Sequence, residues 1–158
     1  MSDAILNLSC YKFTPLDDLE AHRQVVAAAC REQEVKGTVL LAPEGINFFL
    51  AGTRPQLDAV LAVLRRLPGL ADLAPKESPS ASRPFRRMLV KIKKEIIAFG
   101  VPGVDPARAP APKLKPAELK RWLDEGRPVV LLDTRNVYEV RMGTFRGALA
   151  PQIGRAHV

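Results

Sequence analysis

Three charged residues near the end of the chain have a spacing that suggests a built site. Asp133 directly follows an apolar run, and Arg135 and Glu139 come two and six residues after it. Gly143 and Gly147 then bracket a turn. A carboxylate at the end of a buried strand is costly without a partner. We therefore expect Asp133, Arg135 and Glu139 to form an ion-paired cluster with a structural role, which shapes the floor of a site.

The chain carries few side chains that could act as nucleophiles or metal ligands. Its two cysteines, Cys10 and Cys30, are too few for a disulfide scaffold and lack metal-ligand spacing. The favoured interpretation is that both are small core residues. His22 and His157 are isolated from other ligand-type side chains, so we predict no metal site.

Positive charge is concentrated in the second half of the chain. The net charge is +7: residues 1–82 contribute −2, from 8 basic and 10 acidic side chains, and residues 83–158 contribute +9, from 16 and 7. Such asymmetry indicates an anionic partner, with nucleic acid first among the candidates. A solvated basic face explains the charge equally well.

The densest basic segment is residues 83–94, RPFRRMLVKIKK. Lys91 and Lys93 would share one face of a strand and form a stripe that tracks a phosphate backbone. Phe85 adds a stacking surface. An ordinary solvated strand face is the alternative. The candidate RNA-binding residues of this segment are Arg83, Arg86, Arg87, Lys91, Lys93 and Lys94.

A second candidate contact is the segment PEGIN, residues 43–47. Glu44 and Asn47 are predicted at the tip of a hairpin. One interpretation is turn chemistry, because Gly45 tolerates a positive φ and Asn47 can bond its own backbone. The other is contact with RNA or with a neighbouring domain.

The elements that hold these residues are predicted in the order β-α-β-β-α-β. Two helices then pack on one antiparallel sheet, which is the ferredoxin-like plan of an α+β domain. Thr14 is the expected cap of the first helix, and Thr53, with Gln56 three residues on, is the expected cap of the second. The predicted strands are 4–13, 36–42, 46–51 and 88–99, with a further short strand near 74–78, and the first helix runs to about residue 33.

The second part of the chain is predicted to be a shorter α/β unit. Residues 101–113 contain four prolines and no apolar period, so they are predicted to form a stiff linker. A helix over 116–125 and a strand over 129–132 follow. With residues 1–100 as the first domain, residues 114–158 are short for a domain of their own. They either dock on the first domain or belong to an incomplete one.

Three segments together resemble one protein family. Residues 133–148, DTRNVYEVRMGTFRGA, resemble the opening of a rhodanese domain. Residues 36–52 and 85–100 resemble the N-terminal, acylphosphatase-like domain of the rhodanese-related tRNA uridine 5-hydroxylases. That family usually continues the PEGIN motif with Gly-Thr, where this chain has Phe48 and Phe49. These two aromatics either pack in the core or stack on a base.

The resemblance implies a tRNA-modifying oxidoreductase. Its activity would be 5-hydroxylation of the wobble uridine with molecular oxygen as co-substrate, and its partner would be tRNA. The reactive cysteine of such a rhodanese domain has no match here and is expected beyond Val158, so this chain would hold the substrate-binding domain and an incomplete rhodanese-like domain. No further cofactor is expected.

Two other functions remain open at this point. The rhodanese signature is equally typical of a sulfurtransferase, and the chain could instead be a non-catalytic module that binds RNA or protein. No apolar run approaches the roughly 20 residues of a membrane span, and the N-terminus lacks a signal peptide. We therefore expect a cytoplasmic protein without membrane contact, in which a homo-oligomer is allowed.

Overall fold

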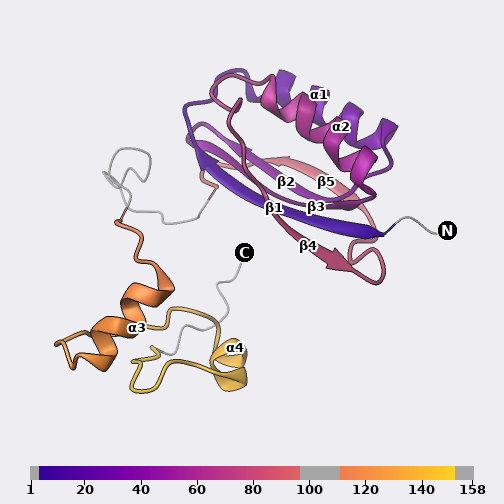
Figure 1. Ribbon diagram of the computed structural model, residues 1–158. Helices are drawn as coiled ribbons and strands as arrows, with labels where there is room; N and C mark the ends of the chain where they lie inside the picture. The colour runs from indigo at the N-terminus through magenta and orange to yellow at the C-terminus, as the bar shows by residue number, and fades with distance from the viewer. Residues whose placement is uncertain (1–3, 97–110, 152–158) are drawn as a thin grey trace. The chain divides into compact units, whose positions relative to one another are not determined.

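The computed structural model describes residues 4–96 and 111–151 and divides into two units (Figure 1). Unit 1 comprises Met1–Pro110 and unit 2 comprises Ala111–Val158. Most of the linker predicted at 101–113 therefore lies outside the described residues. The elements of unit 1 are β1 (Ile5–Phe13), α1 (Leu19–Glu32), β2 (Lys36–Ala42), β3 (Gly45–Gly52), α2 (Arg54–Arg65), β4 (Lys76–Ser80) and β5 (Met88–Ile92).

Unit 1 is a five-stranded sheet in the order β4-β1-β3-β2-β5. Both helices lie on one face of this sheet (Figure 1). The first four strands in that order, β4-β1-β3-β2, are those of the ferredoxin-like plan. The strand expected near 74–78 as an addition is present as β4 and takes the last place of the plan, whereas the strand expected in that place is β5, which is added at the other edge. The expectation of an antiparallel sheet is wrong for β5, which pairs parallel to β2. The α+β class is confirmed for this unit.

The buried face of the sheet packs against the two helices. Period-two alternation puts every second side chain of β1, β2 and β3 on that face. Leu8, Val39 and Phe48 are 0–1% exposed there. On the helix side, Val26 and Cys30 of α1 belong to the same core, as do the buried residues of α2, which are Leu57, Val60, Leu61 and Leu64.

The two helices begin in different ways. The predicted capping box of α2 is confirmed, because the Thr53 backbone N–H donates to Gln56 Oε1 at 2.9 Å. The cap predicted for α1 is wrong. That helix begins at Leu19, and Asp18 is its cap, in a left-handed conformation, with a side-chain oxygen that accepts from the Ala21 N–H. Asp is as good a cap as Thr, and it lies closer to the apolar period of the helix.

The last strand of unit 1 is shorter than the predicted 88–99. β5 ends at Ile92, although the Lys93 N–H still donates to Leu41 O at 2.8 Å. Its apolar face is the predicted one, since Met88 and Val90 pack against the core. Beyond it, the Ile96 N–H donates to Glu44 Oε1 at 2.7 Å, which ties this residue to the turn between β2 and β3. Residues 97–99 lie outside the described residues.

Unit 2 contains α3 (Pro116–Asp124) and α4 (Val137–Met142). The strand predicted at 129–132 does not form; Leu132 makes only an isolated bridge to Leu149. A strand needs neighbours for its backbone groups, and residues 111–151 supply no sheet. The described part of unit 2 therefore does not show the expected α/β rhodanese fold. Among the described residues, no helix is both long enough and apolar enough to cross a membrane.

Candidate functional site

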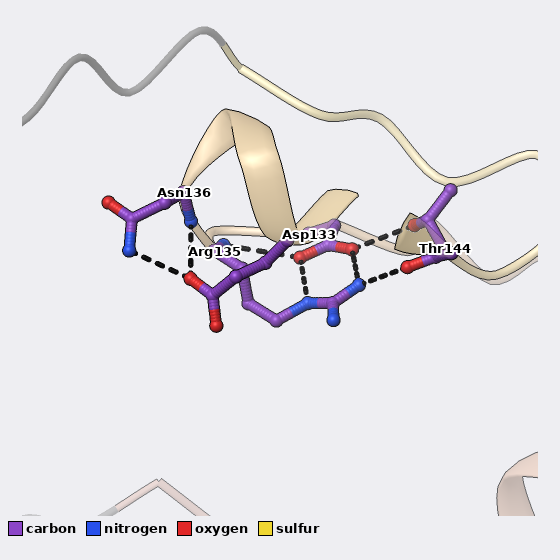
Figure 2. Close-up of polar contacts among 6 residues, drawn as sticks. Asp133, Arg135, Asn136 and Thr144 are labelled. Atoms are coloured by element: carbon purple, nitrogen blue, oxygen red, sulfur yellow. Dashed lines mark hydrogen bonds and ion pairs between the residues drawn. The ribbon is translucent and has the colours of Figure 1, made fainter. Parts of the chain in front are cut away.

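The residues of the rhodanese-like signature form a clamp around the Asp133 carboxylate (Figure 2). Arg135 donates to it twice, from Nε at 2.9 Å and from Nη2 at 2.7 Å, and its backbone N–H adds a third bond at 3.1 Å. Thr144 donates its hydroxyl at 2.7 Å. Arg135 Nη2 also donates to Gly143 O at 2.6 Å. The clamp therefore joins the segment before α4 to the segment after it.

The electrostatics of this clamp favour a permanently charged carboxylate. The Asp133 side chain is 7% exposed. The hydrogen bonds from Arg135, and then the one from Thr144, hold the pKa of Asp133 below its usual range. The pKa of Arg135 is raised by the same pair. A carboxylate so fully occupied is a poor general base, which agrees with the predicted structural role.

Glu139 does not share the Asp133 clamp. Its carboxylate accepts from the Asn136 backbone N–H at 3.0 Å and from the Asn136 side-chain amide at 2.7 Å, and this pairing begins α4. The expected three-residue cluster is thus wrong in this member, because a capping position competes for the same carboxylate. Gly147 has a φ of +76°, so the predicted turn places it in the left-handed region that favours glycine.

The clamp forms one wall of a pocket of about 640 Å³ inside unit 2. The lining residues are Leu131, Leu132, Asp133, Arg135, Gly143, Thr144, Phe145 and Ala148. None of them carries a thiol. The pocket offers apolar surface and one ion pair, so the described residues give it binding capacity without a nucleophile.

Neither cysteine of the chain is activated. Cys30 is buried in the core of unit 1, and burial raises the pKa of its thiol to about 11. Cys10 packs at the margin of the same core, and burial raises the pKa of its thiol as well. A reactive cysteine needs a lowered pKa. This confirms the interpretation of both as small core residues.

The basic segment 83–94 is split between two places in unit 1. Arg83 turns inward and donates to Glu34 O at 3.3 Å and to Gln56 Oε1 at 3.2 Å. Arg86 and Arg87 line a cavity of about 550 Å³ between α1 and the start of β5. Arg83 therefore makes hydrogen bonds within the domain, whereas Arg86 and Arg87 line the cavity.

The cavity beside Arg86 and Arg87 gathers further cations from elsewhere in the chain. Arg23 and Arg31 of α1 and Lys36 of β2 line it together with one acid, Glu34. Arg23 also pairs with Glu20 one turn earlier on α1. Sequence reasoning missed these three, because they lie 47 to 60 residues before the start of the basic segment at Arg83. Only the packing of α1 beside β5 brings them together.

The lysines of the segment lie on and just after β5. Lys91 is exposed and is paired with Leu40 of β2, and Lys93 and Lys94 are exposed beyond the strand end. By alternation, Lys91 points to the face of the sheet opposite the helices. The segment therefore presents cations on the helix side through its arginines and on the open side through Lys91.

The two candidate residues of the PEGIN segment lie in different elements, a turn and a strand. Glu44 is in the predicted turn, where its carboxylate accepts the Ile96 N–H. Asn47 is not at the tip; it is half-buried inside β3, opposite Tyr11 of β1. Of the two aromatics that follow, Phe48 is fully buried and Phe49 is 51% exposed. Among the described residues, no cluster of three or more His, Cys, Asp or Glu could hold a metal ion.

Comparison with known proteins defines the class of unit 1. A family profile described as the UPF0176 acylphosphatase like domain matches residues 5–96. The solved structure of BlrB, a BLUF protein in its dark state, superposes with a TM-score of 0.51 at 20% identity and covers 80% of this chain and 99% of that one. At this identity the likeness concerns the fold alone.

The chain belongs to the UPF0176 family. It is 54% identical over 156 residues to a protein of Thiobacillus denitrificans named tRNA uridine(34) hydroxylase, covering 96% of this chain and 63% of that protein. A protein of the same name from Cupriavidus taiwanensis is 51% identical, with 96% and 55% covered. The chain thus spans between about half and two thirds of the length of these relatives.

Proposed function

We propose that this chain acts in tRNA modification, in the 5-hydroxylation of uridine 34. One observation carries the proposal: identity of 51–54% over 96% of the chain to proteins named tRNA uridine(34) hydroxylase. Molecular oxygen is the proposed co-substrate and tRNA the proposed partner. We propose the cytoplasm as the location because tRNA is the substrate.

Within this activity, unit 1 is proposed to bind the RNA. Its cavity beside α1 collects five cations, and Lys91 of β5 and Lys93 and Lys94 just after it add three more. Cations at this density neutralise backbone phosphates without reading the base sequence. The Asp133–Arg135 clamp is proposed to shape the rhodanese-like segment, and the reactive thiol is proposed to be neither Cys10 nor Cys30.

Sulfur transfer is the rival reaction, since the signature at 133–148 is shared. It would require a thiolate that carries a persulfide, and burial raises the pKa of both thiols of this chain. The described residues therefore supply no thiolate for sulfur transfer, and they supply no reactive thiol for hydroxylation either, so the names of the relatives alone favour hydroxylation. The non-catalytic module is the third candidate, and it predicts RNA binding without any change in modified nucleosides.

Mass spectrometry of tRNA nucleosides separates the three candidates. A strain that lacks the gene should lose 5-hydroxyuridine derivatives at position 34 and regain them with the gene on a plasmid. Growth under ¹⁸O₂ should then place ¹⁸O in the recovered hydroxyl group. Unchanged nucleosides would contradict the proposal, and thiosulfate-dependent sulfur transfer by the purified gene product would favour the rival. A homo-oligomer stays a prediction that light scattering can check.

A further inference from the structure

The face of the sheet opposite the helices carries an unusual set of side chains. In unit 1, α1 and α2 cover one face only (Figure 1). The register places residues from all five strands on the other face, which we call the open face. One row across it contains Lys76, Ser9, Phe49, Thr38 and Leu89, and the next contains Tyr11, Asn47, Leu40 and Lys91.

Two aromatic side chains lie at the centre of the open face. Tyr11 is on β1 and Phe49 is on β3, and each is 51% exposed. Because Phe49 pairs with Ser9 and Tyr11 pairs with Asn47, the two rings are diagonal neighbours on adjacent strands. Exposed rings at this position are costly in water and add nothing to the core, which Phe48 fills from the other face.

The two rings differ in their surroundings. The small polar residues Ser9 and Thr38 flank Phe49, whereas the ring of Tyr11 packs edge-on against Phe13 of the same strand, with 6.0 Å between the ring centroids. Lys76 lies at the β4 edge of one row and Lys91 at the β5 edge of the other. At the positions that alternation assigns to this face on the five described strands there is no Asp or Glu. The carboxylate of β4, Glu77, pairs with Arg54 of α2 on the helix side.

This arrangement matches the chemistry of an unpaired RNA strand. Bases stack on aromatic rings whatever their sequence, and the phosphates between them need cations nearby. Aromatic rings on the two central strands of a four-stranded sheet are the way in which one common class of RNA-binding domain holds two or three bases. A duplex would not fit, because its bases are already stacked and its phosphates face outward.

We propose that the open face of unit 1 binds unpaired RNA bases, which stack on Tyr11 and Phe49, with Lys76 and Lys91 beside the backbone. The inference rests on the proposed function for the identity of the RNA, a tRNA, but not for the stacking itself. It names where a single-stranded region of the substrate sits, whereas the cation-lined cavity on the helix side contacts phosphates only.

Fluorescence with the full chain tests the stacking directly. The probe is a single-stranded RNA of ten nucleotides with one 2-aminopurine, whose fluorescence falls when the base stacks. The variant is Phe49→Thr, because Thr suits an exposed strand position. Stacking is worth about 1–3 kcal/mol per base, so the dissociation constant should rise about 5- to 150-fold and the quenching should be lost. Tyr11→Thr should act in the same direction.

Three controls separate stacking from other effects. Tyr138→Thr removes an exposed aromatic of unit 2 and should leave both readings unchanged. Because Phe49 is uncharged, Phe49→Thr should also leave the salt dependence of binding unchanged, and an RNA duplex should compete poorly with the probe. Circular dichroism confirms that each variant is folded.

The binding results test the stacking surface, and they do so independently of the nucleoside analysis that tests hydroxylation. Wild-type chain that does not bind the probe, or that binds it without quenching, overturns the inference. So does Phe49→Thr that binds as well as wild type, in which case another occupant, such as a protein segment, covers the face. In either case, a loss of 5-hydroxyuridine derivatives in the gene deletion would still support the proposed function. Conversely, probe binding with unchanged tRNA nucleosides keeps the stacking surface and removes the proposed function.

Discussion

Two neighbours from opposite sides of α4 stabilise the charge of Asp133. Arg135 precedes the helix and Thr144 follows it, and both donate to the same carboxylate. The pKa of Asp133 in the folded chain lies below its unfolded value of about 3.9. The stabilisation from this clamp is therefore complete above about pH 4 and is lost as the pH falls through the lowered folded value.

Replacing the arginine should move this titration. In Arg135→Gln the pKa of Asp133 should rise toward its ordinary value, because the first cause of its lowering is removed. Carbon NMR of the Asp133 carboxyl during an acid titration of the full chain measures the shift. Arg141→Gln removes the same charge from α4 and is the matched control. An Asp133 that titrates normally in the wild-type chain would contradict the clamp.

The prediction for Lys91 and Lys93 concerns how strongly the affinity for tRNA depends on salt concentration. Each phosphate contact that is lost reduces the slope of log affinity against log salt concentration by about 0.7 to 0.9. Changing both lysines to Gln should therefore make tRNA binding less salt-dependent by up to twice that amount. Anisotropy of a labelled tRNA at several salt concentrations measures the slope.

The control is a second double variant that removes the same amount of positive charge from a different part of the chain. Lys115→Gln with Lys120→Gln removes two lysines from unit 2, where Lys120 pairs with Asp124. This variant should keep the wild-type slope. An equal fall in both double variants would mean that net charge alone, rather than β5, sets the salt dependence.

At the scale of the strand, the neighbours Phe48 and Phe49 have opposite roles. Phe48 lies wholly in the core and Phe49 lies on the open face, because successive side chains of β3 alternate. Phe48→Ala should lower the free energy of unfolding by about 3–5 kcal/mol, since it leaves a cavity. Phe49→Thr should change it by less than about 1 kcal/mol. Urea denaturation followed by circular dichroism compares them, and similar losses in both would contradict the assigned faces.

The sequence predicts elements that are determined by neighbouring residues along the chain. It does not predict features that depend on pairing with distant segments. The box of Thr53 and Gln56 is local, so the start of α2 is as predicted. The parallel pairing of β5 with β2 depends on residues far apart in the chain. β5 ends at Ile92, inside the apolar alternation that predicts a longer strand, and the bond from the Ile96 N–H to Glu44 joins residues 52 apart in the sequence.

The same distinction between local signals and distant contacts applies to the candidate site. The Asp133–Arg135 pair joins residues two apart and follows from the cost of an unpaired charge. Glu139 was misassigned because two local motifs compete for one carboxylate. The cavity that Arg23 and Arg31 line could not be predicted from the sequence, because its other cations come from β2 and from the segment before β5.

At the scale of the whole molecule, the two units differ in what they bury. Unit 1 has a core of large apolar side chains with 0–2% exposure, among them Leu41, Ile46 and Leu57. In residues 111–151 no residue is buried, and Leu132, Phe145 and Leu149 are 59–61% exposed. Burial of apolar surface is the main stabilising contribution to folding, so unit 1 should account for most of the stability of the chain.

Hydrogen exchange of the full chain measures this difference segment by segment. Amides of β1, β2 and β3 should exchange only through global unfolding of unit 1, because they are paired inside a sheet that the helices cover. Amides of α3 and α4 should exchange orders of magnitude faster, since short helices without buried contacts are marginal in water. Phe48→Ala should then speed exchange in the sheet and leave α3 and α4 unaffected. Equal protection in both units would show that unit 2 gains its stability from contacts beyond its own described residues.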